Sequence, residues 1–396
     1  MTGSELKAIA ANSSGGSIWP GLAAAISVIV YTVFLLIVES QNAIMALLAF
    51  AVGAVLVANW TGLKTRISSS FEGRDNMLSL ALVLGTLAIA VIFYEDHFVL
   101  LLVTTVILYV LVTLGLNIQF GFAGLLNFAG ASFFGVGGYT AAVLVANTGI
   151  PHLLVILAGG VMAAVVGSLL LLPVLRTRGH YAAVVTIAFA LLFKTFLEVN
   201  DVLGGPQGLH VPGLSILGWE FNDNIEIGET IELSFYINYV LLSLAVLTIA
   251  FMFVRRLERS WIGLNLDALR LDEAASKCFG LNIMRWKITG FLIGNLLIGI
   301  AGAIYAMMIG FIAPTNFTFG DSLIFVSIVL LGGIGNVWGL ILATIIVVII
   351  PEKLQAIQEY RFLLYAALVM AMLLFRPEGL LPRPVRSYFP GWRADG

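Results

Sequence analysis

The stretch Phe98-Val-Leu-Leu-Leu-Val-Thr-Thr-Val-Ile-Leu-Tyr-Val-Leu-Val-Thr-Leu-Gly-Leu116 contains no charged residue. At about 1.5 Å per residue, a helix of this length is close to the roughly 30 Å of hydrocarbon in a bilayer. The stretch therefore predicts a transmembrane helix.

The whole chain has the same apolar character, because its 396 residues are 60% hydrophobic and 11% charged, with a mean hydropathy of +1.04. A soluble protein needs more polar surface than this to cover its core. We predict an all-α polytopic membrane protein.

Other apolar segments of similar length recur along the chain. They fall at residues 20–38, 43–59, 77–94, 131–146, 152–173, 182–197, 234–254, 288–312 and 362–375. Together with residues 98–116 they predict about ten transmembrane helices. A further apolar stretch, 322–350, is interrupted at Gly332-Gly-Ile-Gly-Asn336 and predicts a broken or re-entrant pair of half-helices. Asn117 to Gly130 interrupts the apolar pattern in the same way, and such backbone at membrane depth must be surrounded by protein or a water-lined cavity.

The charged residues predict the orientation. Positive residues gather in residues 64–74, 176–178, 255–287 and 376–393, which the positive-inside rule places in the cytoplasm. The loop 198–233 has seven acidic residues and no Lys or Arg, so we expect it on the outer side with some local structure. We expect an N-terminal extension with two spans at 1–76, a main membrane domain at 77–382 and a cytoplasmic tail at 383–396.

The cytoplasmic segment 255–287 is the most polar part of the membrane domain, with seven Lys or Arg and four Asp or Glu. Ser260 is a typical helix N-cap, and Gly280 suits a left-handed C-terminal stop, so an amphipathic helix is expected near 260–280. Apolar residues recur there at helical spacing beside charged ones: Leu264, Ala268, Leu271, Ala275 and Cys278, next to Asp267, Arg270 and Lys277. Such an element either lies on the membrane or fills a groove on a partner.

Uncharged amides at membrane depth require hydrogen-bond partners. Asn117, Gln119 and Asn127 therefore either line a polar pathway or hold helices together, and Asn295 has the same two interpretations. The glycines of residues 130–139 suit close helix packing, the interpretation we favour, or a pathway. Lys194, near the outer end of its span, suits snorkelling to the interface.

The sequence lacks the residues that several classes of function require. A net charge of −2 offers no basic field for nucleic acid, and the single Cys278 allows neither an intramolecular disulfide nor a cysteine metal cluster. None of the six lysines follows a glycine, so the chain has no phosphate-binding loop, and another chain must bind any ATP that is used. No zinc-protease or serine-nucleophile motif is present either, so we expect no catalytic residue, no metal and no enzyme activity.

Six separated blocks carry a family resemblance. They are Asn117-Ile-Gln-Phe-Gly-Phe-Ala-Gly-Leu-Leu-Asn-Phe, Gly204-Gly-Pro-Gln-Gly-Leu, Asp272-Glu-Ala-Ala-Ser-Lys-Cys-Phe-Gly-Leu-Asn282, Pro314-Thr-Asn-Phe-Thr-Phe, Leu331-Gly-Gly-Ile-Gly-Asn and Arg376-Pro-Glu-Gly-Leu-Leu-Pro382. In their order and spacing the chain resembles the permease subunits of bacterial branched-chain amino acid ABC importers, of the LivM type.

The resemblance implies a multi-pass subunit of the bacterial inner membrane that contacts lipid and pairs with a homologous second permease. It also implies two cytoplasmic subunits that bind and hydrolyse ATP with Mg²⁺, and an extracytoplasmic binding protein that delivers a neutral amino acid. Importers of this kind insert a Glu-Ala-Ala loop into the ATPase, which matches Glu273, Ala274, Ala275 and Gly280 here. The step from Ala275 to Gly280 is one residue longer than the common form.

The charged Asp267, Arg270 and Asp272 complete the candidate coupling residues, and Asn117, Gln119 and Asn127 are the candidates for the substrate route. Three alternatives stay open, of which an intramembrane enzyme is the least favoured, because the chain has no recognisable catalytic constellation. A urea or short-amide ABC permease would share this architecture, and an ion-coupled secondary transporter would need no ATPase, although no acidic residue stands at mid-membrane to serve it.

Overall fold

The computed structural model describes residues 19–38, 40–60, 75–176, 181–216, 218–227 and 231–353, together with 360, 363, 366, 367, 370, 374, 379–381 and 383. These residues form two compact units. The first runs to Val99 and includes Lys353, and the second runs from Leu100 to Glu352 and includes the described residues beyond. Most of the expected span 362–375 and the tail from residue 384 onward lie outside the described residues.

The first unit is helical. It contains α2 (Trp19–Ile37), α3 (Gln41–Trp60) and α5 (Asp75–Ile92). Gly85 of α5 lies directly against the side chain of Ile29 in α2, so α5 packs against α2 in this unit. This compact unit therefore extends past residue 76, where the N-terminal extension is expected to end.

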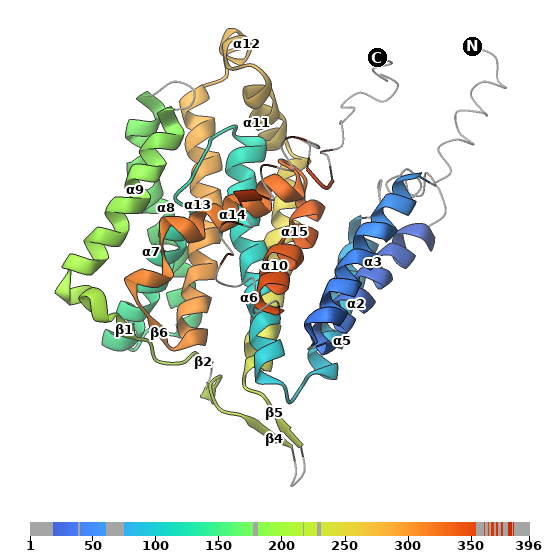
Figure 1. Ribbon diagram of the computed structural model, residues 1–396. Coiled ribbons are helices and arrows are strands. Elements are labelled where there is room, and N and C mark those ends of the chain that lie inside the picture. Colours follow the sequence, from blue (N-terminus) through green and yellow to red (C-terminus); the bar gives the residue numbers. More distant parts are fainter. Residues whose placement is uncertain are drawn as a thin grey trace, which may run out of the picture. The chain divides into compact units, whose positions relative to one another are not determined.

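The second unit contains the remaining helices (Figure 1). They are α6 (His97–Asn117), which enters from the first unit, the π-helix η1 (Ile118–Phe122), α7 (Gly130–Asn147), α8 (His152–Arg176), α9 (Tyr181–Val199), α10 (Tyr236–Glu258), α11 (Trp261–Leu271), α12 (Glu273–Cys278), α13 (Ile283–Ile309), η4 (Pro314–Asn316), α14 (Phe319–Gly332) and α15 (Val337–Lys353).

The predicted spans within the described residues coincide with helices of the two units, which confirms an all-α membrane protein. Among those residues, six helices are long and apolar enough to cross a membrane. They are His97–Phe122, His152–Val174, Tyr181–Val199, Tyr236–Glu258, Ile283–Ile309 and Pro314–Gly332. The expected number of about ten is not confirmed.

Glycines bring α7, α8 and α13 together at the centre of the second unit. A Cβ at Gly137 of α7 would collide with the backbone of Gly299 in α13, and one at Gly299 would lie 2.6 Å from the carbonyl oxygen of Gly159 in α8. Small residues let helix backbones approach this closely in lipid, where van der Waals contact drives association. The packing interpretation of Gly137 is therefore confirmed.

Both expected helix interruptions are present. The helix that begins at His97 becomes a π-helix at Ile118 and stops at Phe122, and α7 starts only at Gly130. The stretch 322–350 is divided between α14 and α15, with Gly333 and Gly335 at φ of 107° and 85°. Backbone angles in this region strongly favour glycine. We call residues 333–336 the second break, and η1 with residues 123–129 the first break.

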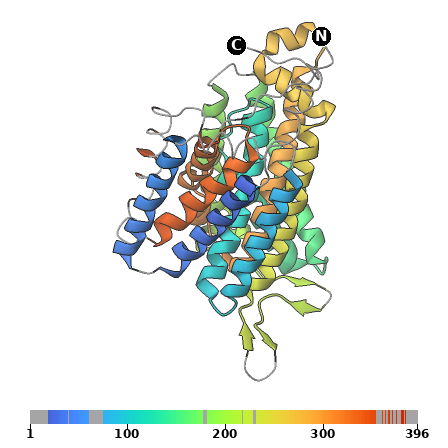
Figure 2. The same ribbon diagram turned by 90° about the vertical axis from the view of Figure 1, so that its right-hand side faces the viewer.

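The acidic loop has the local structure expected of it. It contains η2 (Asp201–Leu203), η3 (Gly205–Gln207), β1 (Leu209–His210), β2 (Ser215–Ile216), β3 (Trp219–Glu220), β4 (Ile225–Ile227) and β5 (Ile231–Leu233). Strand β1 pairs with β6 (Phe311–Ile312), directly after α13. The strands lie at one end of the second unit and α11 and α12 at the other, as both views show (Figures 1 and 2). The acidic loop and the segment 255–287 therefore face opposite ends of the helices.

Candidate functional site

The segment 255–287 begins where α10 ends. The buried carboxylate of Glu258 forms an ion pair of 2.6 Å with Arg255, and the backbone then turns into α11. The hydroxyl of Ser260 accepts a hydrogen bond from the N–H of Ile262, which confirms Ser260 as the N-cap. Leu266 and Leu269 are buried on the inner face of α11. The rest of the second unit therefore holds α11 by its apolar face.

The expectation of one helix over 260–280 is wrong. Asp272 has an extended backbone (φ −154°, ψ 109°), and its carboxylate accepts hydrogen bonds from the N–H groups of Ala274 and Ala275. An aspartate that caps in this way ends one helix and starts the next. The expected apolar stripe is accordingly divided between α11 and α12.

The short helix α12 ends at Cys278, and Gly280 provides the left-handed stop that the sequence predicts. This glycine has φ of 80°, its N–H bonds to the carbonyl of Lys277, and the next N–H, of Leu281, bonds to the carbonyl of Ser276. These two bonds form a Schellman motif, which satisfies carbonyls that the helix end would leave free. With Asp272 at its start, α12 is capped at both ends.

Apolar side chains are exposed around α12. Leu271 is 80% exposed, Phe279 87% and Trp261, at the start of α11, 67%. Ala274 and Ala275 are exposed on α12 itself. Clustered apolar exposure outside the membrane-spanning helices is typical of a protein interaction site.

Glu273 is positioned by an ion pair. Its carboxylate lies 2.6 Å from Nζ of Lys287 in α13, and its side chain stays 55% exposed. Glu273, the residue that matches the family's glutamate, thus connects α12 to a membrane-spanning helix. Its side chain still faces outward.

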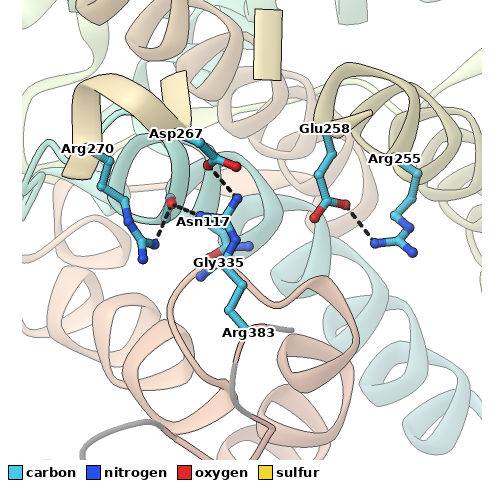
Figure 3. A network of polar contacts seen from close by, with 8 residues as sticks. Asn117, Arg255, Glu258, Asp267, Arg270, Gly335 and Arg383 are labelled. Atoms are coloured by element: carbon cyan, nitrogen blue, oxygen red, sulfur yellow. Dashed lines mark hydrogen bonds and ion pairs between the residues drawn. The ribbon is translucent and has the colours of Figure 1, made fainter. Parts of the chain in front are cut away.

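Asp267 and Arg270 instead point toward the interior of the second unit (Figure 3). Asp267 accepts a hydrogen bond of 2.5 Å from Nη2 of Arg383, and Nη1 of Arg270 donates one of 2.7 Å to the carbonyl of Gly121. Partial burial and the neighbouring Arg383 guanidinium lower the pKa of Arg270, and Asp267 opposes this. Arginine stays charged at neutral pH regardless. These two coupling candidates therefore connect α11 to η1 and to the chain beyond α15.

The three pathway candidates are fully buried and belong to two separate contacts. The side-chain oxygen of Asn117 accepts a hydrogen bond of 2.8 Å from the N–H of Gly335, which joins the end of α6 to the second break. Gln119 accepts one of 2.7 Å from Asn127 and donates one of 2.9 Å to Asn295 of α13. The amides thus connect the first break to α13 and to the second break.

Two of these amides have spare donors. Among the described residues, Nδ2 of Asn117 and Nδ2 of Asn295 are buried with no hydrogen-bond partner. An unpaired buried donor costs ~1–3 kcal/mol, so a polar group that reaches either nitrogen would be bound favourably. The role of Asn117, Gln119 and Asn127 in a route stays a prediction.

The comparison with known families agrees with the blocks that carry the resemblance. Residues 98–375 match the family described as the permease component of the branched-chain amino acid transport system. The chain belongs to this family. The match starts within two residues of Leu100, the first residue of the second unit, and leaves α2, α3 and α5 outside it.

Individual relatives support this assignment. The permease is 35% identical to the Escherichia coli (strain K12) high-affinity branched-chain amino acid transport system permease protein LivM, over 70% of this chain and 69% of the relative. It is 28% identical to a probable LivM of Methanocaldococcus jannaschii, over 69% of this chain and 90% of that protein. It is also 24% identical to E. coli LivH, a second permease protein, over 70% of this chain and 92% of LivH. No solved structure matches the chain.

Sequence reasoning missed Arg383 as a site residue of this permease and counted it only among the positive charges near the C-terminus. Its ion-pair partner, Asp267, lies 116 residues away, so no local spacing connects the two. The glycines that surround its side chain, Gly121 and Gly335, did fall within the quoted family blocks. Gly121 and Gly335 come close to Arg383 only when the chain folds. Their presence in a motif therefore does not indicate that contact.

Proposed function

We propose that this chain is the pore-forming permease subunit of an ATP-driven importer for branched-chain or other neutral amino acids. It shares the translocation route with a homologous second permease, and it hydrolyses no ATP itself. The observation that carries the proposal is the capped, outward-facing helix α12, with exposed apolar side chains, at one end of a bundle of membrane helices. An ion-coupled secondary transporter has no ATPase subunit for this exposed surface to bind.

In this proposal, α11 and α12 lie in the cytoplasm and bind ATPase subunits that use ATP with Mg²⁺. Leu271 and Phe279 would enter an apolar groove of the ATPase, because burying a large apolar side chain contributes about 1.5–3 kcal/mol. Glu273 would stand at the rim, where its exposed carboxylate can meet a basic group. The C-terminus is cytoplasmic and the membrane is the bacterial inner membrane.

At the opposite end, the acidic loop 198–233 would receive the extracytoplasmic binding protein. Its pairing with the end of α13 through β1 and β6 supports a mechanical role, since docking there acts on the helix at the centre of the unit. An amino acid zwitterion needs both hydrogen-bond acceptors and donors along its route. The unpaired amide nitrogens of Asn117 and Asn295 supply donors, if helix movement opens the two breaks.

Co-purification tests the proposal. The chain is expressed with the second permease and two candidate ATPase subunits from the same organism, and affinity purification is expected to recover all of them. Competition then separates substrates, because excess leucine, but not urea, should abolish uptake of labelled isoleucine. Inhibition by urea alone would favour the urea permease, and uptake driven by an ion gradient with no ATPase present would favour a secondary transporter.

A further inference from the structure

We propose that Arg383 is a positioning residue that transmits movement of the coupling helix α11 to the two helix breaks of the membrane domain. The inference rests on the proposed function, which supplies the ATPase that moves α11. We call the side chains of Arg383, Asp267 and Arg270, with the carbonyl of Gly121, the Arg383 latch (Figure 3).

The guanidinium group of Arg383 makes three contacts, two of them within the latch and one with a neighbouring ring. Arg383 Nη2 bonds to the carboxylate of Asp267 at 2.5 Å, and its Nη1 donates to the carbonyl of Gly121 at 3.0 Å. Its Cζ also lies 4.9 Å from the ring centroid of Phe122. The ion pair is largely shielded, with the two side chains only 13% and 14% exposed. Arginine is suited to this position because its planar fork can bond two acceptors and stack on a ring together.

The Gly121 carbonyl lies at the end of α6 and η1, where helix carbonyls lack partners and carry the negative end of the helix dipole. It accepts from Arg270 at 2.7 Å as well as from Arg383 at 3.0 Å. Two charged donors on one carbonyl give this helix end a stronger attachment than a single neutral hydrogen bond. Any movement of α11 is therefore applied directly to the first break.

The second break touches the same latch. A Cβ at Gly335 would lie 2.6 Å from Cδ of Arg383 and 3.3 Å from Nη1 of Arg270. A Cβ at Gly121 would lie 2.6 Å from the backbone nitrogen of Gly335, so the two breaks are in direct backbone contact. The N–H of Gly335 bonds to Asn117, which closes a path from α11 through Arg383 to both breaks.

The backbone that carries Arg383 is itself fixed to α14. The N–H of Leu380 donates to the carbonyl of Leu331 at 2.7 Å, and the N–H of Leu381 donates to that of Gly332 at 3.3 Å. These bonds satisfy carbonyls at the C-terminal end of α14, and Gly379 packs directly on Gly333. Arg383 thus has its backbone attached beside the second break and its side chain attached to α11.

The test uses Arg383→Ala, Arg383→Lys and Asp267→Asn in the complete complex reconstituted in proteoliposomes. The matched control is Arg285→Ala, which removes an exposed arginine from the first turn of α13. ATP hydrolysis and uptake of labelled leucine are measured on the same vesicles. We expect Arg383→Ala and Asp267→Asn to assemble and hydrolyse ATP, with leucine uptake per ATP lower by about tenfold, within the range of coupling between protein sites.

Arg383→Lys should recover part of the lost uptake, because an ammonium can pair with Asp267 but cannot bond Gly121 in the same fork geometry. Arg285→Ala should match the wild type. Normal uptake per ATP in both Arg383→Ala and Asp267→Asn would overturn the inference. A purely structural role predicts parallel loss of assembly, hydrolysis and uptake, and that result would also overturn it.

Amide hydrogen exchange gives a measurement that does not depend on the proposed function. Exchange at residues 119–122 and 333–336 should become faster in Arg383→Ala than in Arg285→Ala, and unchanged exchange there would contradict the latch. If wild-type uptake proves independent of the ATPase, the proposed function fails, and the exchange comparison still decides whether the latch holds the two breaks together.

Discussion

Replacing Gln119 by Leu tests whether the buried amides hold the helices together. The side chain of Gln119 donates to Asn295 at 2.9 Å and to the carbonyl of Phe291 at 3.3 Å, and accepts from Asn127 at 2.7 Å. Side-chain hydrogen bonds inside a membrane protein average about 0.6 kcal/mol, so losing all three lowers the free energy of unfolding by roughly 2 kcal/mol. If Asn127 and Asn295 find no replacement, each unpaired group adds ~1–3 kcal/mol.

A loss of roughly 2 kcal/mol in the free energy of unfolding corresponds to a fall in Tm of about 4–8 °C for a unit of the size of the second unit. The assay is thermal unfolding of the purified permease in detergent. Thr104→Val is the matched control, because Thr104 is equally buried but bonds only within its own helix, to Leu100. Its Tm should fall by no more than about 2 °C. Equal Tm values for the two variants would refute the packing role, and loss of uptake at unchanged stability would place Gln119 in the route.

The remaining predictions concern α12 and its two ends. Asp272→Ala removes both capping bonds of α12 and should destabilise that helix by about 1 kcal/mol, seen as faster amide exchange at Ala274 and Ala275 together with weaker ATPase binding. Gly280→Val should weaken ATPase binding, because φ of 80° strains a β-branched residue by about 1–2 kcal/mol. Gly280→Asn should bind the ATPase nearly normally, because asparagine tolerates this conformation. Equal binding by the two variants would contradict the backbone argument. Phe279→Ser should leave Tm unchanged, since the side chain is 87% exposed, yet reduce ATPase affinity about tenfold or more in a pull-down titration.

The spans and their interruptions could be predicted because each leaves a local pattern. Long apolar runs fix the approximate bounds of a membrane helix, and glycine or amide clusters without charge mark the places where α6 and α14 end. Ser260 and Gly280 were likewise readable as helix ends, because each satisfies backbone groups within four residues of itself.

Two features were not predicted from local patterns. They are the helix boundary at Asp272, where two backbone conformations compete, and the contacts of Arg383 with residues distant in the sequence. Asp272 could continue a helix or cap a new one, and two capping bonds to Ala274 and Ala275 decide for the cap. The Asp-Glu-Ala-Ala order does contain a signal, since an N-cap followed by an acidic residue is typical of a helix start. No such signal exists for Arg383, whose contacts with Asp267 and Gly121 arise only when the chain folds.

We propose that ATP hydrolysis in partner subunits drives amino acid through this permease. The measurement that tests it is accumulation of labelled leucine in proteoliposomes that contain both permeases, the binding protein and the ATPase subunits. We predict uptake against a leucine gradient that requires ATP and disappears when the ATPase subunits are omitted or cannot hydrolyse ATP. Undiminished accumulation without a functional ATPase would contradict the account.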